Sequence, residues 1–159
     1  MAQIDTIYFG NPIFDITMQD PEGEVQGRYN LESGLACLAT PEQMPIYAEA
    51  WARADRITGA GGSALNMARA QMHANSSGKV MYFGCIGDDE FGRTLTTAVE
   101  ESGIESRFQT TTEEPTGSCA CVIVGVKRAL CANIAAAKKF SMDHLNAHIV
   151  SFPSSLPYF

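Results

Sequence analysis

The sequence predicts an α/β protein in which a mostly parallel sheet is flanked by helices and accompanied by a small β-rich lid. Ile4–Phe9 mixes β-branched and aromatic residues and stops at Gly10-Asn11-Pro12, which is typical of a buried strand that ends in a turn. A glycine turn, a helical segment and another strand-like segment then follow, and such alternation indicates parallel strands joined by helices. Two β-rich stretches, at about residues 16–38 and 116–134, flank the alternating part and are assigned to the lid.

The first two helices are predicted from their N-terminal signals. Thr40, Pro41 and Gln43 supply an N-cap, a first-turn proline and a capping-box partner, so a helix is expected to start near Pro41. Gly59–Ser63 is expected to be a loop that opens the second helix, whose apolar residues recur at intervals of three or four.

The alternating pattern continues after the second helix. Lys79–Phe83 is predicted to be a strand and Gly84–Asp89 a loop. Phe91–Val99 carries apolar residues at helical spacing, and Gly103 closes this third helix.

The lid and the end of the chain are predicted from β-rich patterns. Residues 16–38 are polar and glycine-rich without a helical period, which favours short strands or a hairpin outside the main core. Ser118–Val126 is predicted to be a strand, with a turn at Lys127-Arg128 and a partner strand at Leu130–Ile134. A last strand is expected near His148–Val150.

Length and charge bound the class of protein. The chain has 159 residues, 45% of them hydrophobic, which is enough for one domain and too little for two. Its 18 acidic and 11 basic residues give a net charge of −7, which repels nucleic-acid backbones and acidic membranes, so we expect neither as a partner. The longest apolar stretch, Cys119–Val126, is far below the roughly 20 residues of a membrane span, and no signal-peptide pattern opens the chain. We therefore expect a soluble cytoplasmic protein, without excluding the nucleus.

The cysteines favour reduced thiols. Their number, 5, is odd, and no zinc-type CxxC pair occurs among them. Cys119 and Cys121 lie two apart in a β-like run and so share a sheet face, where they would hold a soft metal only if two more ligands converged. Buried cysteines more often behave as small hydrophobic residues, so no metal site is assigned.

The most informative stretch is Gly-Gly-Ser-Ala-Leu-Asn at 61–66, followed about twenty residues later by Gly-Cys-Ile-Gly-Asp-Asp-Glu-Phe-Gly at 84–92. Paired glycines before a helix let a ligand approach the backbone, and the helix N-terminus offers free N–H groups. A double glycine by itself is more often an ordinary turn.

A dinucleotide-binding reading competes with this one, because Gly59, Gly61 and Ala64 fit the G-x-G-x-x-A pattern. That fingerprint should follow the first strand directly, yet about fifty residues separate Phe9 from Gly59. The next predicted strand also ends in Gly84 where an acidic residue is required. The context therefore disfavours a dinucleotide site.

Asp88, Asp89 and Glu90 look like a metal-binding or acid–base cluster. They directly precede a predicted helix, however, and acidic residues at a helix N-terminus stabilise the helix dipole. We interpret the cluster as structural.

Several motifs, spread in order from about Ile7 to Val150, resemble the PfkB/ribokinase family of sugar and nucleoside kinases and, within it, the adenosine kinases. The glycine motifs at 61–66 and 84–92 look like the first family signature. The motifs similar to adenosine kinases are GNPIFD at 10–15, PTGSCAC at 115–121, RAL at 128–130 and ANIAAA at 132–137. The resemblance implies a ribokinase-like fold.

The resemblance also implies roles for individual residues. Asp15 matches the family aspartate that accepts hydrogen bonds from two ribose hydroxyls. The residues that match the ribose-holding loop and helix start are Gly61, Gly62, Ser63 and Asn66. Asn11 matches a polar group near the base.

Six further positions match groups around the base and the phosphates. Five fall where the family places apolar contacts to adenine: Ile13, Leu38, Cys119, Leu130 and Ile134. Arg128 matches a lid arginine that closes towards the phosphates. Without the resemblance, the apolar residues would be assigned to core or lid packing.

The resemblance implies adenosine or a related nucleoside as substrate, ATP and Mg²⁺ as cofactors, and a monomeric enzyme. The family's catalytic base is an aspartate in a later Gly-Ala-Gly-Asp segment, which does not occur among these residues. We therefore assign no catalytic residue, and expect residues 1–159 to form the N-terminal part of a kinase domain without its catalytic half. The alternatives are a non-catalytic binding fragment and a ribokinase-type sugar kinase.

Overall fold

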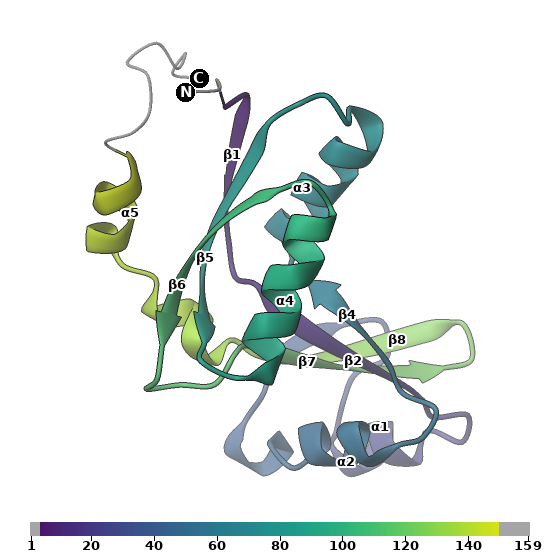
Figure 1. Cartoon of the computed structure of the whole chain (residues 1–159). Helices are drawn as coiled ribbons and strands as arrows, with labels where there is room; N and C mark the ends of the chain where they lie inside the picture. The colour runs from purple at the N-terminus through teal and green to yellow at the C-terminus, as the bar shows by residue number, and fades with distance from the viewer. Residues whose placement is uncertain (1–3, 150–159) are drawn as a thin grey trace.

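The computed structural model describes residues 4–149, which form two sheets with helices packed on them (Figure 1). The first sheet is parallel and has the order β1-β5-β6, formed by β1 (Thr6–Phe9), β5 (Val80–Gly87) and β6 (Glu105–Thr111). The second is mixed and has the order β3-β8-β7-β2-β4. Its strands are β2 (Ile13–Gln19), β3 (Ala36–Leu38), β4 (Ile57–Gly61), β7 (Ser118–Val124) and β8 (Lys127–Asn133). The predicted α/β class is confirmed.

Helices cover both sides of the parallel sheet. α3 (Ser63–Ala74) and α4 (Glu90–Glu101) lie on one side in Figure 1, and α5 (Met142–Ile149) lies on the other. β5 is buried along its whole length, because it is the central strand and is covered on both faces. The 3-10 helix η2 (Ala135–Lys139) also packs on this strand. No helix among the described residues is long and apolar enough to cross a membrane.

The five-stranded sheet has a core face and an opposite face. Short helices, α1 (Glu24–Arg28) and α2 (Ile46–Ala52), lie along one side of it in Figure 1, with the 3-10 helix η1 (Pro41–Gln43) before α2. Side chains alternate between faces along a strand. The buried set that belongs to the main core is Phe14, Ile16, Met18, Ala120, Val122, Ala129 and Cys131.

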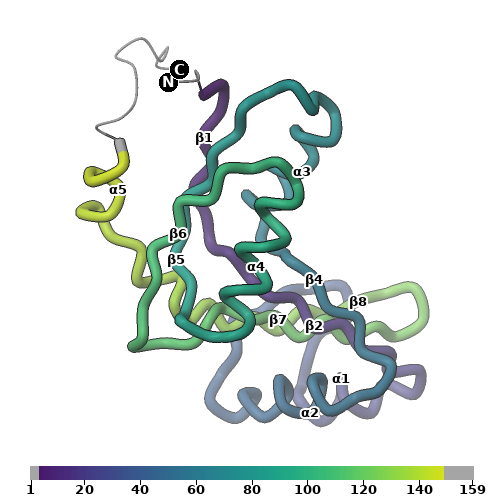
Figure 2. The backbone as a smooth tube through the Cα atoms, in the orientation of Figure 1, coloured from purple at the N-terminus to yellow at the C-terminus, as the bar shows by residue number. Residues whose placement is uncertain are grey.

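The chain crosses between the two sheets several times, and two of these crossings lie next to each other (Figure 2). β1 continues into β2 through Gly10-Asn11-Pro12, and β4 leads through Gly62 into α3. Gly62 has a φ of 103°, and a Cβ there would lie 2.3 Å from the carbonyl oxygen of Asn11. The two crossings therefore touch, and only glycine fits at the second.

Two predicted loops are wrong in part. Gly59–Ser63 was expected to be a loop, but residues 59–61 form the end of β4, whose backbone pairs antiparallel with β2 from Ile13↔Gly61 to Thr17↔Ile57. The predicted strand at Lys79–Phe83 continues to Gly87, because the glycines at 84 and 87 pair in register with β6. Pairing with a neighbouring strand, which local sequence does not reveal, decides both cases.

Other predicted bounds shift for similar reasons. β6 was not predicted, because its sequence is mostly polar and half-exposed. The turn between β7 and β8 lies at Gly125-Val126, two residues before the predicted position. The expected strand near His148–Val150 is wrong over 148–149, which end α5, and Val150 lies outside the described residues. The stretch at 16–38 contains α1, and Ile16 and Met18 belong to the main core.

Candidate functional site

Most of the predicted site residues gather on the face of the five-stranded sheet opposite the core. Strand register places Asp15 beside Cys119, Cys121 beside Leu130, and Gly61 beside Ile13. Because side chains of registered partners project to the same side of a sheet, these residues share one face. We call it the open face, defined by Ile13, Asp15 and Thr17 of β2, Gly61 of β4, Cys119 and Cys121 of β7, and Arg128, Leu130 and Ala132 of β8.

The apolar part of the open face is a cluster separate from the main core. Ile13, Cys119 and Cys121 are buried at its centre, and Leu130, Ala132 and Ile134 pack against them half-buried. The structure thus brings together four of the five predicted adenine contacts. Leu38, the fifth, lies on the edge strand β3, where it pairs in register with Ala132 of β8. Unlike the other four, it is 65% exposed.

Asp15 lies in the middle of the open face against Gly61. A Cβ at position 61 would lie 2.1 Å from Oδ2 of Asp15, so any larger residue would displace the carboxylate. Burial raises the pKa of the Asp15 carboxyl, and the Arg128 guanidinium acts to lower it. The carboxylate is therefore partly dehydrated and faces one nearby positive charge.

Arg128 is exposed on β8, opposite Ile123 in register. Its positive charge acts to lower the pKa of Asp15. Arg128 lies at the edge of the open face, from where a long side chain can reach a bound ligand. An arginine that is only solvated would be exposed in the same way.

The remaining predicted residues lie at the crossing between the sheets. Asn11, Ser63 and Asn66 are exposed, and Ser63 is the first residue of α3. The backbone N–H of Asn66 donates to the Gly62 carbonyl oxygen at 2.9 Å, which closes the first turn of the helix. The helix N-terminus and the β4 end therefore adjoin the open face at Gly61.

Two residues of this region were not singled out from the sequence. Gly117 leads into β7, and a Cβ there would lie 2.8 Å from Ile13 Cδ1 and 2.9 Å from the Ile134 carbonyl oxygen. Thr17 lies next to Cys121 in register, and its hydroxyl acts to lower the pKa of the Cys121 thiol. The two-residue period of a strand, applied from Asp15, would have found Thr17.

The acidic cluster at 88–90 is structural, as predicted. Asp89 caps α4: its carboxylate accepts hydrogen bonds from the Gly92 N–H at 2.8 Å and from the Thr116 N–H and hydroxyl, both at 2.7 Å. Burial acts to raise the pKa of Asp89, but the hydrogen bonds from Thr116 and Gly92 outweigh it and lower the pKa. Asp88 pairs with Arg93 at 3.6 Å. Asp89 thereby ties the start of α4 to the segment that leads into β7.

The two thiols of the open face are closely coupled. Cys119 Sγ and Cys121 Sγ lie 3.9 Å apart. The hydrogen bond between them raises the pKa of Cys119 and lowers the pKa of Cys121, so Cys121 is the first of the pair to ionise. The Thr17 hydroxyl and the Arg128 charge also lower the pKa of Cys121.

The potential metal ligands that converge among the described residues do not suit a magnesium ion. Mg²⁺ requires oxygen ligands in near-octahedral geometry. The acidic residues 88 and 89 are engaged in the contacts given above, and the group of potential ligands that converges within the described part of the chain is Asp15, Cys119 and Cys121. Two thiols do not suit a hard cation, so no step here is assigned to Mg²⁺.

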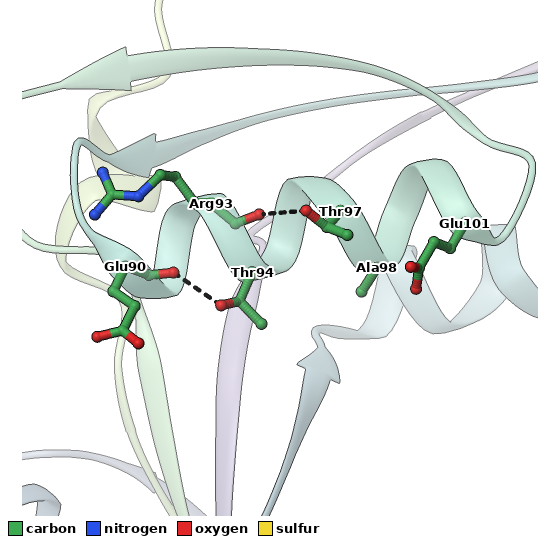
Figure 3. A pocket seen from close by; sticks show the side chains of 6 residues that line it. All are labelled: Glu90, Arg93, Thr94, Thr97, Ala98 and Glu101. Carbon is green, nitrogen blue, oxygen red and sulfur yellow. Dashed lines mark hydrogen bonds between the residues drawn. The ribbon is translucent and has the colours of Figure 1, made fainter.

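A surface hollow of about 320 Å³ runs along the solvent side of α4 (Figure 3). The Thr94 and Thr97 hydroxyls donate to the carbonyl oxygens of Glu90 and Arg93 one turn earlier, so they are already satisfied by their own helix. Its lining residues are Glu90, Arg93, Thr94, Thr97, Ala98 and Glu101, none of which is a predicted site residue. We interpret it as a solvated helix face.

Comparison with known proteins identifies the family. Residues 39–155 match the model of the pfkB family carbohydrate kinases. The matched range covers well over half of the chain. The chain belongs to the PfkB family. Curated relatives of this PfkB chain include the adenosine kinases of Schizophyllum commune, 32% identical over 95% of the chain, and Saccharomyces cerevisiae, 33% identical over 89%. The chain spans 44% and 43% of their respective lengths.

Solved structures give the same picture. The PfkB chain matches Anopheles gambiae adenosine kinase, determined in complex with P1,P4-di(adenosine-5) tetraphosphate, with a TM-score of 0.86 and 31% identity over 93% of this chain and 44% of that one. It matches Schistosoma mansoni adenosine kinase, determined in complex with adenosine in an occluded loop conformation, with a TM-score of 0.84 and 25% identity over 94% of this chain and 43% of that one. These matches confirm the predicted family and the predicted ribokinase-like fold.

Proposed function

We propose that this chain is the nucleoside-binding part of an adenosine kinase, which transfers the γ-phosphate of ATP to the 5′-hydroxyl of adenosine and so forms AMP. The observation that carries the proposal is the open face, where one carboxylate and one apolar cluster lie side by side next to a helix N-terminus. The relatives named adenosine kinase support this choice of substrate. The proposed role is purine salvage.

Asp15 is proposed to hold the ribose. Its carboxylate accepts hydrogen bonds and cannot donate, so it suits two hydroxyl donors of a sugar. Burial has already removed part of its water, which strengthens the hydrogen bonds that a ligand can offer. Gly61 and Gly62 let the sugar approach the backbone, with Ser63 and Asn66 at the adjoining helix start.

The adenine ring is proposed to pack on the apolar cluster of Ile13, Cys119, Leu130 and Ile134, with Leu38 at the sheet edge and Asn11 near its polar rim. A flat aromatic base gains affinity from apolar surface that is otherwise exposed to water. The half-burial of Leu130 and Ile134 leaves such surface available. The β-rich stretches at about 16–38 and 116–134 are proposed to act as the lid, with Arg128 closing towards the phosphates.

The chemical step needs groups beyond this face. Phosphoryl transfer depends on positioning and charge neutralisation, with ATP, Mg²⁺ and an aspartate base as the expected participants. Within the 159 residues no Gly-Ala-Gly-Asp segment supplies that base. We assign binding of the nucleoside to these residues and leave transfer to the whole protein. The five free thiols support a location in the reducing cytoplasm.

A substitution at Asp15 tests the proposal. In this chain completed with the C-terminal half of the Schizophyllum commune relative, Asp15→Ala should weaken adenosine binding by about ten- to a hundredfold. This corresponds to the roughly 1.5–3 kcal/mol of hydrogen bonds to a charged group. Asp88→Ala is the matched control, because that exposed carboxylate pairs only weakly with Arg93. Isothermal titration calorimetry measures both.

The outcome that contradicts the proposal is equal loss of affinity in the two variants, which would place the site elsewhere. A nucleoside and sugar panel on the wild-type chimera tests specificity. Preference for ribose or fructose over adenosine would favour the ribokinase-type sugar kinase alternative.

A further inference from the structure

We propose that the open face carries a binding site for a thiophilic divalent cation of the Zn²⁺ type, with Cys119 Sγ, Cys121 Sγ and the Asp15 carboxylate as its three protein ligands. The three ligand atoms lie within 4.8 Å of one another although they come from two strands, β2 and β7. Parallel pairing of Asp15 with Cys119 holds them together, and the two-residue spacing of β7 puts Cys121 on the same face.

The sulfur geometry fits a tetrahedral ion. Two thiolates at about 2.3 Å from Zn²⁺ in tetrahedral geometry are separated by about 3.8 Å. The two Sγ atoms already lie 3.9 Å apart, so the pair can bind an ion without moving the strand. The carboxylate oxygen must come closer, and the half-buried Asp15 side chain can do so by rotating about its own bonds.

The ligand chemistry selects the class of ion. Two thiols and one carboxylate suit Zn²⁺ or a similarly soft cation, and they do not suit Mg²⁺ or Ca²⁺. Three ligands leave a fourth position for water, which is the pattern of an open zinc site. Binding replaces the two thiol protons, which pass to solvent, by the metal ion. Arg128 is the nearby opposing charge, and three anionic ligands outnumber it.

Occupation of this site has a consequence that rests on the proposed function. The cation would take the carboxylate that Asp15 is proposed to offer to the ribose, and it would lie among the apolar contacts of the base. Nucleoside and cation are therefore expected to exclude one another. In the sequence, a metal site at the two cysteines needed two further ligands. The fold supplies one of them, Asp15.

Cobalt substitution tests the site on the 159-residue chain. Co²⁺ added under a non-thiol reductant should give thiolate-to-cobalt absorption in the near ultraviolet, and Zn²⁺ should abolish it. Cys121→Ala should weaken Zn²⁺ binding more than tenfold, since even a group that only supports a ligand is worth about 10–100-fold. Cys85→Ala is the matched control, because Cys85 is also buried but lies in the parallel sheet. Competition with a chromophoric chelator gives the affinities.

Several outcomes would overturn the site. One is unchanged Zn²⁺ affinity in Cys121→Ala, and another is loss of binding in a Cys37→Ala, Cys131→Ala double variant instead. Cys121→Ser, which keeps the size and polarity of the side chain, decides the matter if the alanine variant does not fold. Asp15→Asn should retain the thiolate absorption and lower the affinity. If adenosine fails to displace the cobalt signal, competition is rejected and the ribose role of Asp15 is at fault, while the cation site stands.

Discussion

The two faces of the five-stranded sheet are built from the same strands, but one is packed in the core and the other is the proposed ligand site. On the core face, Ile16 and Val122 are completely buried beneath the helices. On the open face, Asp15 and Arg128 stand beside a smaller apolar cluster that is only partly covered. Both faces of β7 look alike in sequence, because residues 119–124 form one continuous apolar run.

The difference between the faces teaches that packing, and not residue type, separates core from site. Cys119 and Ala120 are both small, apolar and buried, yet they belong to different clusters. The core face is closed by helices of the same chain, so its residues should matter for stability. The open face is the proposed ligand site, so its residues should matter for binding.

The largest expected effect concerns phosphoryl transfer by the 159-residue chain, which carries the open face but no assigned catalytic base. The 159-residue chain with Mg-ATP should form no measurable AMP from adenosine, because a positioned base contributes typically 10²–10⁴-fold and each preorganised donor about 10²–10³-fold. A radiolabelled phosphotransfer assay measures this. AMP above a matched blank, abolished by Asp15→Asn, would show that the chain contains its own catalytic groups.

A pair of truncations on opposite faces should separate stability from binding. Ile16→Ala should lower the free energy of unfolding by about 2–5 kcal/mol, because it leaves a cavity in the closed core. Leu130→Ala, on the half-buried open face, should cost about 1–2 kcal/mol or less. Urea unfolding followed by Trp51 fluorescence measures both, since the Trp51 ring lies 6.3 Å from Phe14 on the core side. Equal losses would show that the open face is closed by the chain itself.

The Asp89 carboxylate should stabilise the fold in a pH-dependent way. Asp89→Asn should cost about 0.5–2 kcal/mol at neutral pH, the usual value of a helix cap. Its folded-state pKa is lowered, so the stabilisation is present above the unfolded pKa of about 3.9 and lost as the pH falls through the folded pKa. Unfolding of both proteins from pH 7 to pH 3 should therefore converge at low pH. A constant difference across that range would mean that the charge is irrelevant.

Asp15 should show the opposite sign and the smallest effect. Burial raises its pKa, so the ionised carboxylate destabilises the fold once the pH rises above the unfolded value of about 3.9 and through the folded pKa. Asp15→Asn should therefore increase the thermal midpoint at pH 7 and leave it unchanged below about pH 4. A decrease at pH 7 would indicate that Asp15 supports the fold as Asp89 does.

The sequence by itself determined the α/β class, the family resemblance and the residue types of the site. Local signals suffice for these, because capping boxes, glycine turns and period-two patterns depend on neighbours in the chain. The capping box at Thr40 and Gln43 is present as predicted, and the acidic start of α4 is structural as predicted. The predicted site residues were assigned from motifs that occur in the family's order along the chain.

Only the tertiary structure decided which of these residues meet. β4 exists because β2 offers it a partner, and β5 extends to Gly87 because β6 does the same. The separation of Cys119 from Ala120, and the approach of Asp15 to Gly61 and Cys121, depend on strand register between segments about forty to a hundred residues apart in the sequence. Local propensity carries no information on register, so the open face appears only when the strands are paired.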